Sequence, residues 1–346
     1  MLDTLQISIT GSAPRQSIMQ GADALSTSRR EDGIMRILVI GAGALGGYYG
    51  GRLVEAGRDV TFLVRAARAE QIARHGLRIE SQHGDADLRP RAVTASSLDG
   101  PYDLILLSVK AYSLDPAMDD MTPAVGPDTA ILPLLNGMRH LNLLAKRFGP
   151  ARVLGGAARI AATLGPEGQV LQRMMPNHDL IFGEIAGGVS ERVRAIAAAF
   201  ERANFAPQAS EQIVQEMWEK WVALSTTAGI TCLMRAAIGD ILAVPGGRDA
   251  ILMLLAECRA VAAAAGHEPR PAFMDFLMGV LTKEGSTLTA SMLRDMERGG
   301  PTEGEHTLGD LTERADRMGV PTPVLRLARC HVAAYEVRRE RERTAP

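Results

Sequence analysis

The residue best suited to proton transfer is Lys220, which lies in the amphipathic stretch Glu211–Thr231. If this stretch is one helix, steps of three or four residues place Lys220 on a face with four apolar side chains: Ile213, Met217, Leu224 and Ala228. Removing an ammonium group from water lowers its pKa, so such a lysine can protonate a carbonyl oxygen that becomes an alkoxide during hydride transfer. The alternative is a lysine at the edge of the stripe whose charge reaches solvent.

A glycine-rich loop predicts a binding site for a dinucleotide. Its six residues follow the expected strand Ile37–Ile40 and lead into the expected helix Leu45–Glu55; they are Gly41, Ala42, Gly43, Ala44, Leu45 and Gly46. In this context the first glycine permits a tight turn, the second lets the backbone approach a pyrophosphate, and the third allows close helix packing. The N-terminus of the helix offers N–H groups and a positive dipole end to the phosphates. The alternative is a glycine-rich turn that binds no ligand.

The end of the second expected strand, Val60–Val64, indicates the type of cofactor. Proteins that bind NAD usually carry an acidic residue there, whereas this strand is followed by Arg65. Asp59 lies at the opposite end of the strand and cannot take the acidic role. Arg65, with Arg68 one turn later, can pair with a 2'-phosphate, which favours NADP(H). Arg65 could also be an ordinary surface arginine.

The elements that must position these residues fall into two groups. Between Arg36 and Asn204, short aliphatic runs alternate with helical stretches, which predicts an α/β domain with a mainly parallel sheet. Its expected strands are Ile37–Ile40, Val60–Val64, Leu104–Val109 and Ala130–Leu135, with shorter ones near Val153, Val170 and Leu180.

After about Ser210 the strand pattern ends, and an all-helical domain is expected. Its amphipathic stretches are Glu211–Thr231, Gly247–Ala265, Pro271–Thr282, Thr287–Arg298, Thr302–Met318 and Val324–Arg341. We therefore expect a disordered extension over residues 1–34, a nucleotide-binding domain over 35–206 and a helical domain for substrate and catalysis over 207–346. Met35 directly precedes the first strand, which is compatible with translation beginning there.

Composition favours a cytoplasmic protein that acts on small molecules. The 346 residues carry a formal net charge of −2, and no apolar run is long enough for a membrane helix, so neither nucleic acid nor a membrane is an expected partner. The three cysteines lack metal-ligand spacing, and each is expected to be buried. Glu303, His306 and Asp310 share a helix face that would suit a metal, but no separate ligand cluster supports one, so no metal is expected.

Several further segments carry a resemblance to a known family. They are SVKAY at Ser108–Tyr112, LNGM at Leu135–Met138, MWEKW at Met217–Trp221, SMLRD at Ser291–Asp295 and PTE at Pro301–Glu303. With the glycine loop, their order and spacing resemble the ketopantoate reductase (2-dehydropantoate 2-reductase) family over Met35 to Arg341. The resemblance implies an N-terminal Rossmann-type, doubly wound parallel sheet followed by a helical domain. NADPH and a 2-keto acid would then meet in the cleft between the two domains.

The same resemblance implies roles for individual residues. Lys220 matches the general acid, and Glu303 matches a glutamate that orients it or binds a substrate hydroxyl. Asn136 and Lys110 match residues beside the nicotinamide and ribose of the cofactor, and Ser291 matches a serine that helps to hold the substrate carboxylate. These roles suit a 2-keto acid, which needs donors for its carboxylate, a proton for its ketone and a hydride on the opposite side.

Each assignment has a structural alternative. Asn136-Gly137 could be only a turn after a strand, and Ser291 could be a helix N-cap. Lys110 could be solvated. Glu303 follows Pro301-Thr302 and could be an acidic residue in a first helical turn, where the helix dipole favours negative charge.

The chain departs from the family pattern on the substrate side. Family members usually carry asparagines one and two turns after the lysine, where this chain has Leu224 and Ala228. The residues after Glu303 also differ from the commoner pattern of an aspartate and an aromatic followed by Asn-Gly; here they read Gly304-Glu305-His306-Thr307-Leu308-Gly309-Asp310. The loss of two amides changes which substrates the site would accept.

The sequence thus predicts an NADPH-dependent oxidoreductase that reduces the ketone of a 2-keto acid. The first candidate is the conversion of 2-dehydropantoate to pantoate in pantothenate biosynthesis. A reductase of a less polar 2-keto acid is the alternative within this class, and a non-catalytic NADP(H)-binding redox sensor is the alternative outside it. A homodimer is an expectation of the family resemblance alone.

Overall fold

The computed structural model describes residues 34–172 and 177–344. From Met35 onward the chain forms one compact unit. The expected extension of residues 1–34 lies, apart from Ile34, outside the described residues. The expected boundary between residues 206 and 207 falls inside strand β12 (Ala206–Ala209), and the long helix after it begins at Ile213. The division into domains 35–206 and 207–346 therefore stays a prediction.

A five-stranded parallel sheet forms the centre of the N-terminal part, with the strand order β5-β2-β1-β6-β7. Its strands are β1 (Arg36–Ile40), β2 (Asp59–Leu63), β5 (Arg91–Val93), β6 (Tyr102–Leu107) and β7 (Val125–Pro133). Ile37, Leu38 and Val39 of β1 have no exposed surface, as expected for a parallel sheet covered on both faces. The strand order reverses direction between β1 and β6, where ligands bind in open α/β sheets. The predicted doubly wound sheet is confirmed.

The structure also contains two smaller sheets that the sequence pattern did not predict. One has the order β4-β3-β10-β9 and the other β12-β11-β8, and both contain antiparallel pairs. Their remaining strands are β3 (Leu77–Ser81), β4 (Ala86–Leu88), β8 (Leu154–Ile160), β9 (Thr163–Leu164), β10 (Val170–Gln172) and β11 (His178–Glu184). The short strands expected near Val153, Val170 and Leu180 thus lie outside the main parallel sheet.

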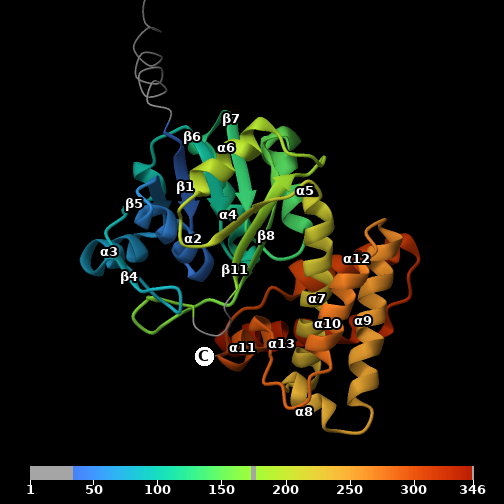
Figure 1. Cartoon of the computed structure of the whole chain (residues 1–346). Coiled ribbons are helices and arrows are strands. Elements are labelled where there is room, and N and C mark those ends of the chain that lie inside the picture. The colour runs from blue at the N-terminus through green and yellow to red at the C-terminus, as the bar shows by residue number, and fades with distance from the viewer. Residues whose placement is uncertain (1–33, 173–176, 345–346) are drawn as a thin grey trace, which may run out of the picture. The chain divides into compact units, whose positions relative to one another are not determined.

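Helices accompany the strands in the N-terminal part (Figure 1). They are α2 (Ala44–Glu55), α3 (Ala66–His75), α4 (Leu114–Met121), α5 (Arg139–Phe148) and α6 (Glu191–Phe200). Helix α2 follows β1 directly, and its residues Tyr48, Tyr49 and Leu53 have no exposed surface. The hydroxyl groups of Tyr48 and Tyr49 bond to β11, and Gly50 packs closely against Phe62 and Val39 of the parallel sheet. These contacts fix α2 in place, and the glycine loop lies at its start.

The described chain after β12 contains helices and no strand, which confirms the helical C-terminal part. Figure 1 shows α7 descending from the strand-rich part into this helical part. The elements are α7 (Ile213–Met234), α8 (Ile238–Leu242), α9 (Gly247–Ala264), α10 (Pro271–Leu281), α11 (Ser291–Glu297), the π-helical turn η5 (Glu305–Gly309), α12 (Asp310–Met318) and α13 (Pro323–Thr344).

Two expectations for the helical part were wrong. The stretch from Thr287 is not helical before Ser291, because its backbone bonds other segments: Leu288 O accepts from Ile238 N at 3.0 Å, and Ala290 N donates to the Thr231 hydroxyl at 3.4 Å. Cys330 is exposed, whereas the other two cysteines, Cys232 and Cys258, are buried as expected.

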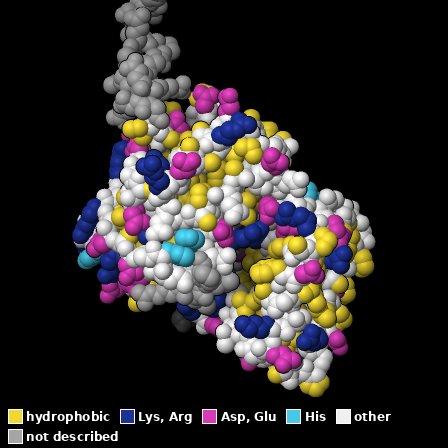
Figure 2. Space-filling model, viewed as in Figure 1, with side chains coloured by type: hydrophobic (Ala, Val, Ile, Leu, Met, Phe, Trp, Pro, Cys, Tyr) yellow, Lys and Arg dark blue, Asp and Glu magenta, His cyan; other side chains and the backbone are white. Residues whose placement is uncertain are grey.

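The surface carries mixed charge. On the face shown in Figure 2, acidic and basic side chains are interspersed. Within the described part of the chain, none of the helices combines the length and the apolar character needed to span a membrane.

Candidate functional site

The glycine loop makes the tight turn that its sequence predicts. Gly41 follows β1 with a φ of +88°, and its N–H donates to Leu63 O at the end of β2 at 2.9 Å. Gly43 is the N-cap of α2 and has no side chain that could cap the helix. The first N–H groups of α2 are therefore left to a ligand, which suits an anion at this position.

The second and third glycines differ in their surroundings. A Cβ added at Gly46 would lie 2.0 Å from Gly41 O and 2.1 Å from Ser108 Oγ, so only glycine fits there. Ser108 itself donates to the carbonyls of Ile40 and Gly41 at 2.8 Å. At Gly43 an added Cβ would meet nothing within 4 Å. The loop is closed where α2 approaches the sheet and open where a pyrophosphate would lie, so it fits a dinucleotide.

Arg65 and Arg68 lie at the start of α3 near this loop. Arg65 is exposed and donates to Ser113 Oγ at 3.3 Å. Arg68 donates from Nε to Ala42 O at 3.1 Å and from Nη1 to Gln71 at 2.6 Å, and burial lowers its pKa. Its Nη2 is buried and has no hydrogen-bond partner among the described residues. A buried guanidinium N–H beside the glycine loop would be satisfied by an anionic group of a bound cofactor.

Lys220 lies on a partly exposed stripe of α7. Between positions 216 and 227 the partly exposed residues are Glu216, Lys220, Ala223, Leu224 and Thr227, and the others are buried. Of the apolar residues predicted to share a face with Lys220, Ile213, Met217 and Ala228 are buried and Leu224 is partly exposed. Thr227, two turns after Lys220, is also partly exposed.

The surroundings of Lys220 favour proton transfer near neutral pH. Loss of hydration is the main cause that lowers its pKa to about 8, and the positive charge of Arg159 acts in the same direction. The negative charge of Glu303 opposes both. An amine with this pKa is partly protonated at physiological pH, and it can give its proton to a developing alkoxide.

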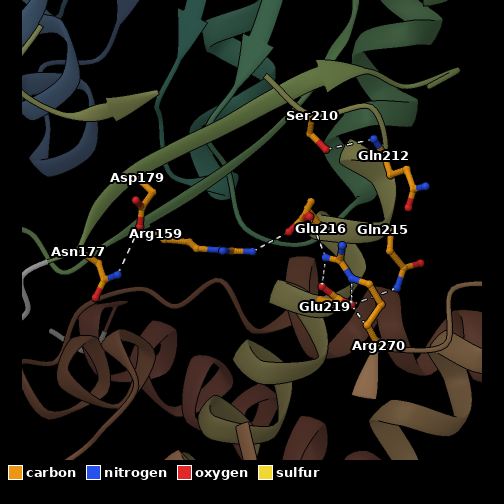
Figure 3. A network of polar contacts seen from close by, with 9 residues as sticks. All are labelled: Arg159, Asn177, Asp179, Ser210, Gln212, Gln215, Glu216, Glu219 and Arg270. Carbon is orange, nitrogen blue, oxygen red and sulfur yellow. Dashed lines mark hydrogen bonds and ion pairs between the residues drawn. The ribbon is translucent and has the colours of Figure 1, made fainter. Parts of the chain in front are cut away.

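A network of ion pairs holds the turn of α7 that precedes Lys220 (Figure 3). Arg159 at the end of β8 donates to Glu216 at 2.7 Å, and Arg270 donates to Glu216 at 2.7 Å and to Glu219 at 2.8 Å. The network thus joins β8, α7 and the start of α10. It fixes the position of α7 and places the Arg159 charge within range of Lys220.

Glu303 connects the helical part to the end of the parallel sheet. Its carboxylate accepts from Lys110 Nζ at 3.1 Å and from the backbone N–H of Ala111 at 3.0 Å. Lys110 also donates to Asp295 of α11 at 3.3 Å. Burial alone would lower the pKa of Lys110, but the two carboxylates raise it above its ordinary value. Lys110 is therefore ion-paired rather than only solvated.

Asn136 and Ser291 are linked to these residues through neighbours in the chain. Asn136 is in a turn after β7, and Gly137 has a φ of +76°. The backbone of Asn136-Gly137 thus forms the turn that the sequence offered as an alternative to a binding role. Ser291 is exposed and is the first residue of α11, whose N-cap is Ala290, so Ser291 is not the cap. Asp295, one turn later on the same face, pairs with Lys110.

Sequence reasoning missed several of these residues. Ser108 and Asp295 lie within motifs that were identified, but their contacts join segments far apart in the chain. Arg159 follows a run of small residues that suggests no site. His140 and His306 form a buried pair whose rings stack, and their separation of 166 positions leaves no local signal. In residues 34–172 and 177–344, no group of three or more His, Cys, Asp or Glu side chains could hold a metal ion.

Comparisons with known proteins agree with this architecture. Residues 37–187 match the family described as "Ketopantoate reductase PanE/ApbA", and residues 212–336 match "Ketopantoate reductase PanE/ApbA C terminal". An "Uncharacterized oxidoreductase YkpB" of Bacillus subtilis is 37% identical over 302 residues, which cover 87% of this chain and 99% of that protein.

Proteins whose names state an activity are also similar. A 2-dehydropantoate 2-reductase of Mesorhizobium japonicum is 30% identical, over 84% of this chain and 94% of that protein. The crystal structure of a 2-dehydropantoate 2-reductase from Methylococcus capsulatus has a TM-score of 0.78 and 32% identity, and covers 88% of this chain and 98% of that one. The two family matches together extend over most of the chain, and the chain belongs to the ketopantoate reductase family of oxidoreductases.

Proposed function

We propose that this oxidoreductase uses NADPH to reduce the ketone of a 2-keto acid to a hydroxyl group. The observation that carries the proposal is the setting of Lys220, an accessible lysine with a pKa of about 8 under the influence of Glu303. The first candidate reaction is the reduction of 2-dehydropantoate to pantoate, which would place the chain in pantothenate biosynthesis. The names of two similar proteins support this substrate.

The chain's residues have complementary roles in this proposal. NADPH, held by the residues named below, would supply a hydride for the carbonyl carbon. Lys220 donates a proton to the carbonyl oxygen, so that the C=O group becomes CH–OH. The carboxylate of Glu303 acts to raise the pKa of Lys220 and of Lys110, and it thereby favours their protonated forms near the reacting oxygen. Ser291 and Asn136 are proposed to bind the substrate. The cofactor is proposed to be bound by the glycine loop together with Arg65, Lys110, Asn136 and Glu303.

The preference for NADPH over NADH is supported by the two arginines at the start of α3. Arg65 is exposed, and Arg68 has a buried N–H without a partner among the described residues. We expect Arg65→Ala to raise the KM for NADPH about tenfold, since a hydrogen bond between charged groups contributes roughly 1.5–3 kcal/mol. The matched control is Arg74→Ala on the same helix, where the arginine pairs with Glu70. Equal losses with NADH and NADPH would refute a role for Arg65 in binding the 2'-phosphate.

A less polar 2-keto acid is the second candidate substrate. Ala223 and Leu224 occupy the accessible stripe of α7 within one turn of Lys220, and neither can hydrogen-bond a substrate hydroxyl. A substrate with an aliphatic chain next to its ketone would bury that chain against Leu224 without leaving a polar group unpaired.

One experiment separates these candidates. NADPH oxidation is followed with 2-dehydropantoate and with 2-keto acids of the same size that lack the hydroxyl group, and NADH is substituted in parallel. A higher kcat/KM for 2-dehydropantoate supports the first candidate, and the reverse order supports the second. Tight NADPH binding without turnover on any member of the panel would refute the reductase and support a redox sensor.

A further inference from the structure

His140 and His306 form a buried pair that the proposed proton transfer does not use. His140 has no exposed surface and His306 is 8% exposed. Nδ1 of His140 lies 3.3 Å from Nε2 of His306, and the ring centroids are 5.5 Å apart with an interplanar angle of 20°. Burial of two imidazole rings costs free energy of desolvation unless their nitrogens are hydrogen-bonded, so the partners of these nitrogens are informative.

The pair joins the Asn136 turn to the segment that carries Glu303. His140 lies in the first turn of α5, directly after the Asn136-Gly137 turn, and His306 lies three residues after Glu303. The backbone of Asn136 is close enough to the His306 ring to raise its pKa through a hydrogen bond. A Cβ added at Gly137 would lie only 3.0 Å from His306 O, so the two backbones are in close contact.

The helix around His306 is also irregular. Residues Glu305–Gly309 form a π-helical turn, and such turns occur often at functional sites. Thr307 in this turn donates from its hydroxyl to Glu303 O at 2.8 Å, and its own carbonyl accepts from Trp221 Nε1 at 3.3 Å. The turn therefore connects Glu303 to Trp221 of α7, the residue that directly follows Lys220.

Both histidines are neutral near pH 7. Burial is the main cause that holds the pKa of His140 well below its ordinary value, and repulsion from His306, when that ring is protonated, and from Lys220 lowers it further. Burial also lowers the pKa of His306. Around His306 the carboxylates of Glu303 and Asp310 favour protonation, whereas Arg139 opposes it.

A neutral pair holds one proton between its two facing nitrogens, and the surroundings determine which ring carries it. The other nitrogen of His140, Nε2, is buried and has no partner among the described residues. An N–H at this position would be a buried donor without an acceptor in the described part of the chain, and the positive charge of Lys220 disfavours a further proton on the ring. The His140 proton therefore lies on Nδ1 and is donated to Nε2 of His306. This leaves His306 with an N–H on Nδ1, and the Asn136 carbonyl is the acceptor that we assign to it.

We propose that His306 is a positioning residue, oriented by His140. It keeps the backbone of Asn136 and the segment that carries Glu303 at fixed positions relative to each other for the reduction. This inference rests on the proposed function, because Asn136 and Glu303 are assigned to substrate and cofactor there. His306 itself touches neither reactant in this assignment. It acts through the hydrogen bond to Asn136 and through the π-helical turn.

The kinetic test compares two replacements of His306. His306→Phe keeps a ring but removes the donor, and we expect kcat to fall about tenfold, as for loss of one buried hydrogen bond. His306→Asn keeps an N–H near the position of Nδ1 and should recover most of kcat. Because Asn136 is also assigned to the cofactor, the KM for NADPH should rise in His306→Phe and return toward the wild-type value in His306→Asn. Equal kcat values for the two variants, or losses that follow only a lower melting temperature, would overturn the inference.

A second test does not depend on turnover. Nitrogen-15 NMR of the wild-type histidine rings at pH 7 should show the Nδ1–H tautomer for His140 and His306, with signals assigned from His140→Asn and His306→Asn. An Nε2–H tautomer on His306 would overturn the inference even in an active enzyme. If the wild type reduces no 2-keto acid, the proposed function fails, and the tautomers still decide whether the pair orients Asn136 as described.

Discussion

Lys110 donates a hydrogen bond from Nζ to the carboxylate of Glu303 at 3.1 Å, which joins the carboxyl end of β6 to the segment before η5. The two residues are 193 positions apart in the chain. Glu303 is also close enough to raise the pKa of Lys220. One carboxylate thus influences both lysines that the proposed reaction needs.

Replacement of Glu303 by glutamine tests this arrangement. Glu303→Gln keeps the shape of the side chain but removes the charge, and we expect kcat/KM to fall about 10- to 100-fold, because a hydrogen bond to a charged group contributes roughly 1.5–3 kcal/mol. Since Glu303 raises the pKa of Lys220, its neutralisation should also move the alkaline loss of activity to lower pH.

The matched control is Glu305→Gln, two residues further along. Glu305 is exposed and pairs with Arg329 instead. Its replacement should leave kcat/KM within about twofold of the wild type, as for most exposed ion pairs. A pH profile for Glu303→Gln that matches the wild type would contradict a direct electrostatic effect on Lys220.

Lys220 should determine how the rate depends on pH. A general acid must be protonated, so the rate should be level up to about pH 7, fall to half near the pKa of about 8 and keep declining above it. Lys220→Ala should lower kcat by about 100-fold or more and remove this alkaline decline. The control is Lys146→Ala, an exposed lysine of α5. Steady-state rates from pH 6 to 10 check both points, and unchanged turnover in Lys220→Ala would exclude the lysine as the acid.

Much of this fold could be predicted because its elements carry local patterns. The aliphatic run at Ile37–Ile40 is buried on both faces, and the glycine loop follows it directly, so strand, turn and helix were all recognisable. The start of α11 was not recognisable. Its N-cap is Ala290, whose N–H is satisfied by the distant Thr231 hydroxyl, and no capping side chain marks the position.

Other parts of the site depend on contacts between distant segments. The spacing of residues places Lys220 on a helix, but whether a face of α7 is accessible depends on what packs against it, and this separates Leu224 from the buried Ala228. Similarly, nothing in the local sequence pairs Lys110 with Asp295 or His140 with His306. Local patterns predict elements, whereas tertiary packing determines which side chains meet.

Gly43 and Gly46 should fail in different ways when replaced by alanine. A Cβ at Gly46 would overlap Gly41 O and Ser108 Oγ, so we expect Gly46→Ala to lower the free energy of unfolding by about 1–3 kcal/mol. A Cβ at Gly43 meets nothing within 4 Å, so Gly43→Ala should fold with wild-type stability but bind NADPH at least tenfold more weakly. Thermal melting and NADPH fluorescence titration measure the two effects. Wild-type affinity in Gly43→Ala would argue against a pyrophosphate at this position.

Leu224 and Ala228 replace the two family asparagines, but the structure shows that they are not equivalent. Leu224 is partly exposed on the stripe with Lys220, whereas Ala228 has no exposed surface.

We expect Leu224→Asn to raise the ratio of kcat/KM for 2-dehydropantoate over an unhydroxylated 2-keto acid about tenfold, because the amide can bond the substrate hydroxyl. Ala228→Asn should instead lower the melting temperature, since a buried amide without partners costs about 1–3 kcal/mol. Competition between the two substrates measures the ratio directly. An unchanged ratio in a folded Leu224→Asn variant would mean that the accessible stripe of α7 does not contact the substrate chain, and specificity would then have to come from the Asn136 and Ser291 side.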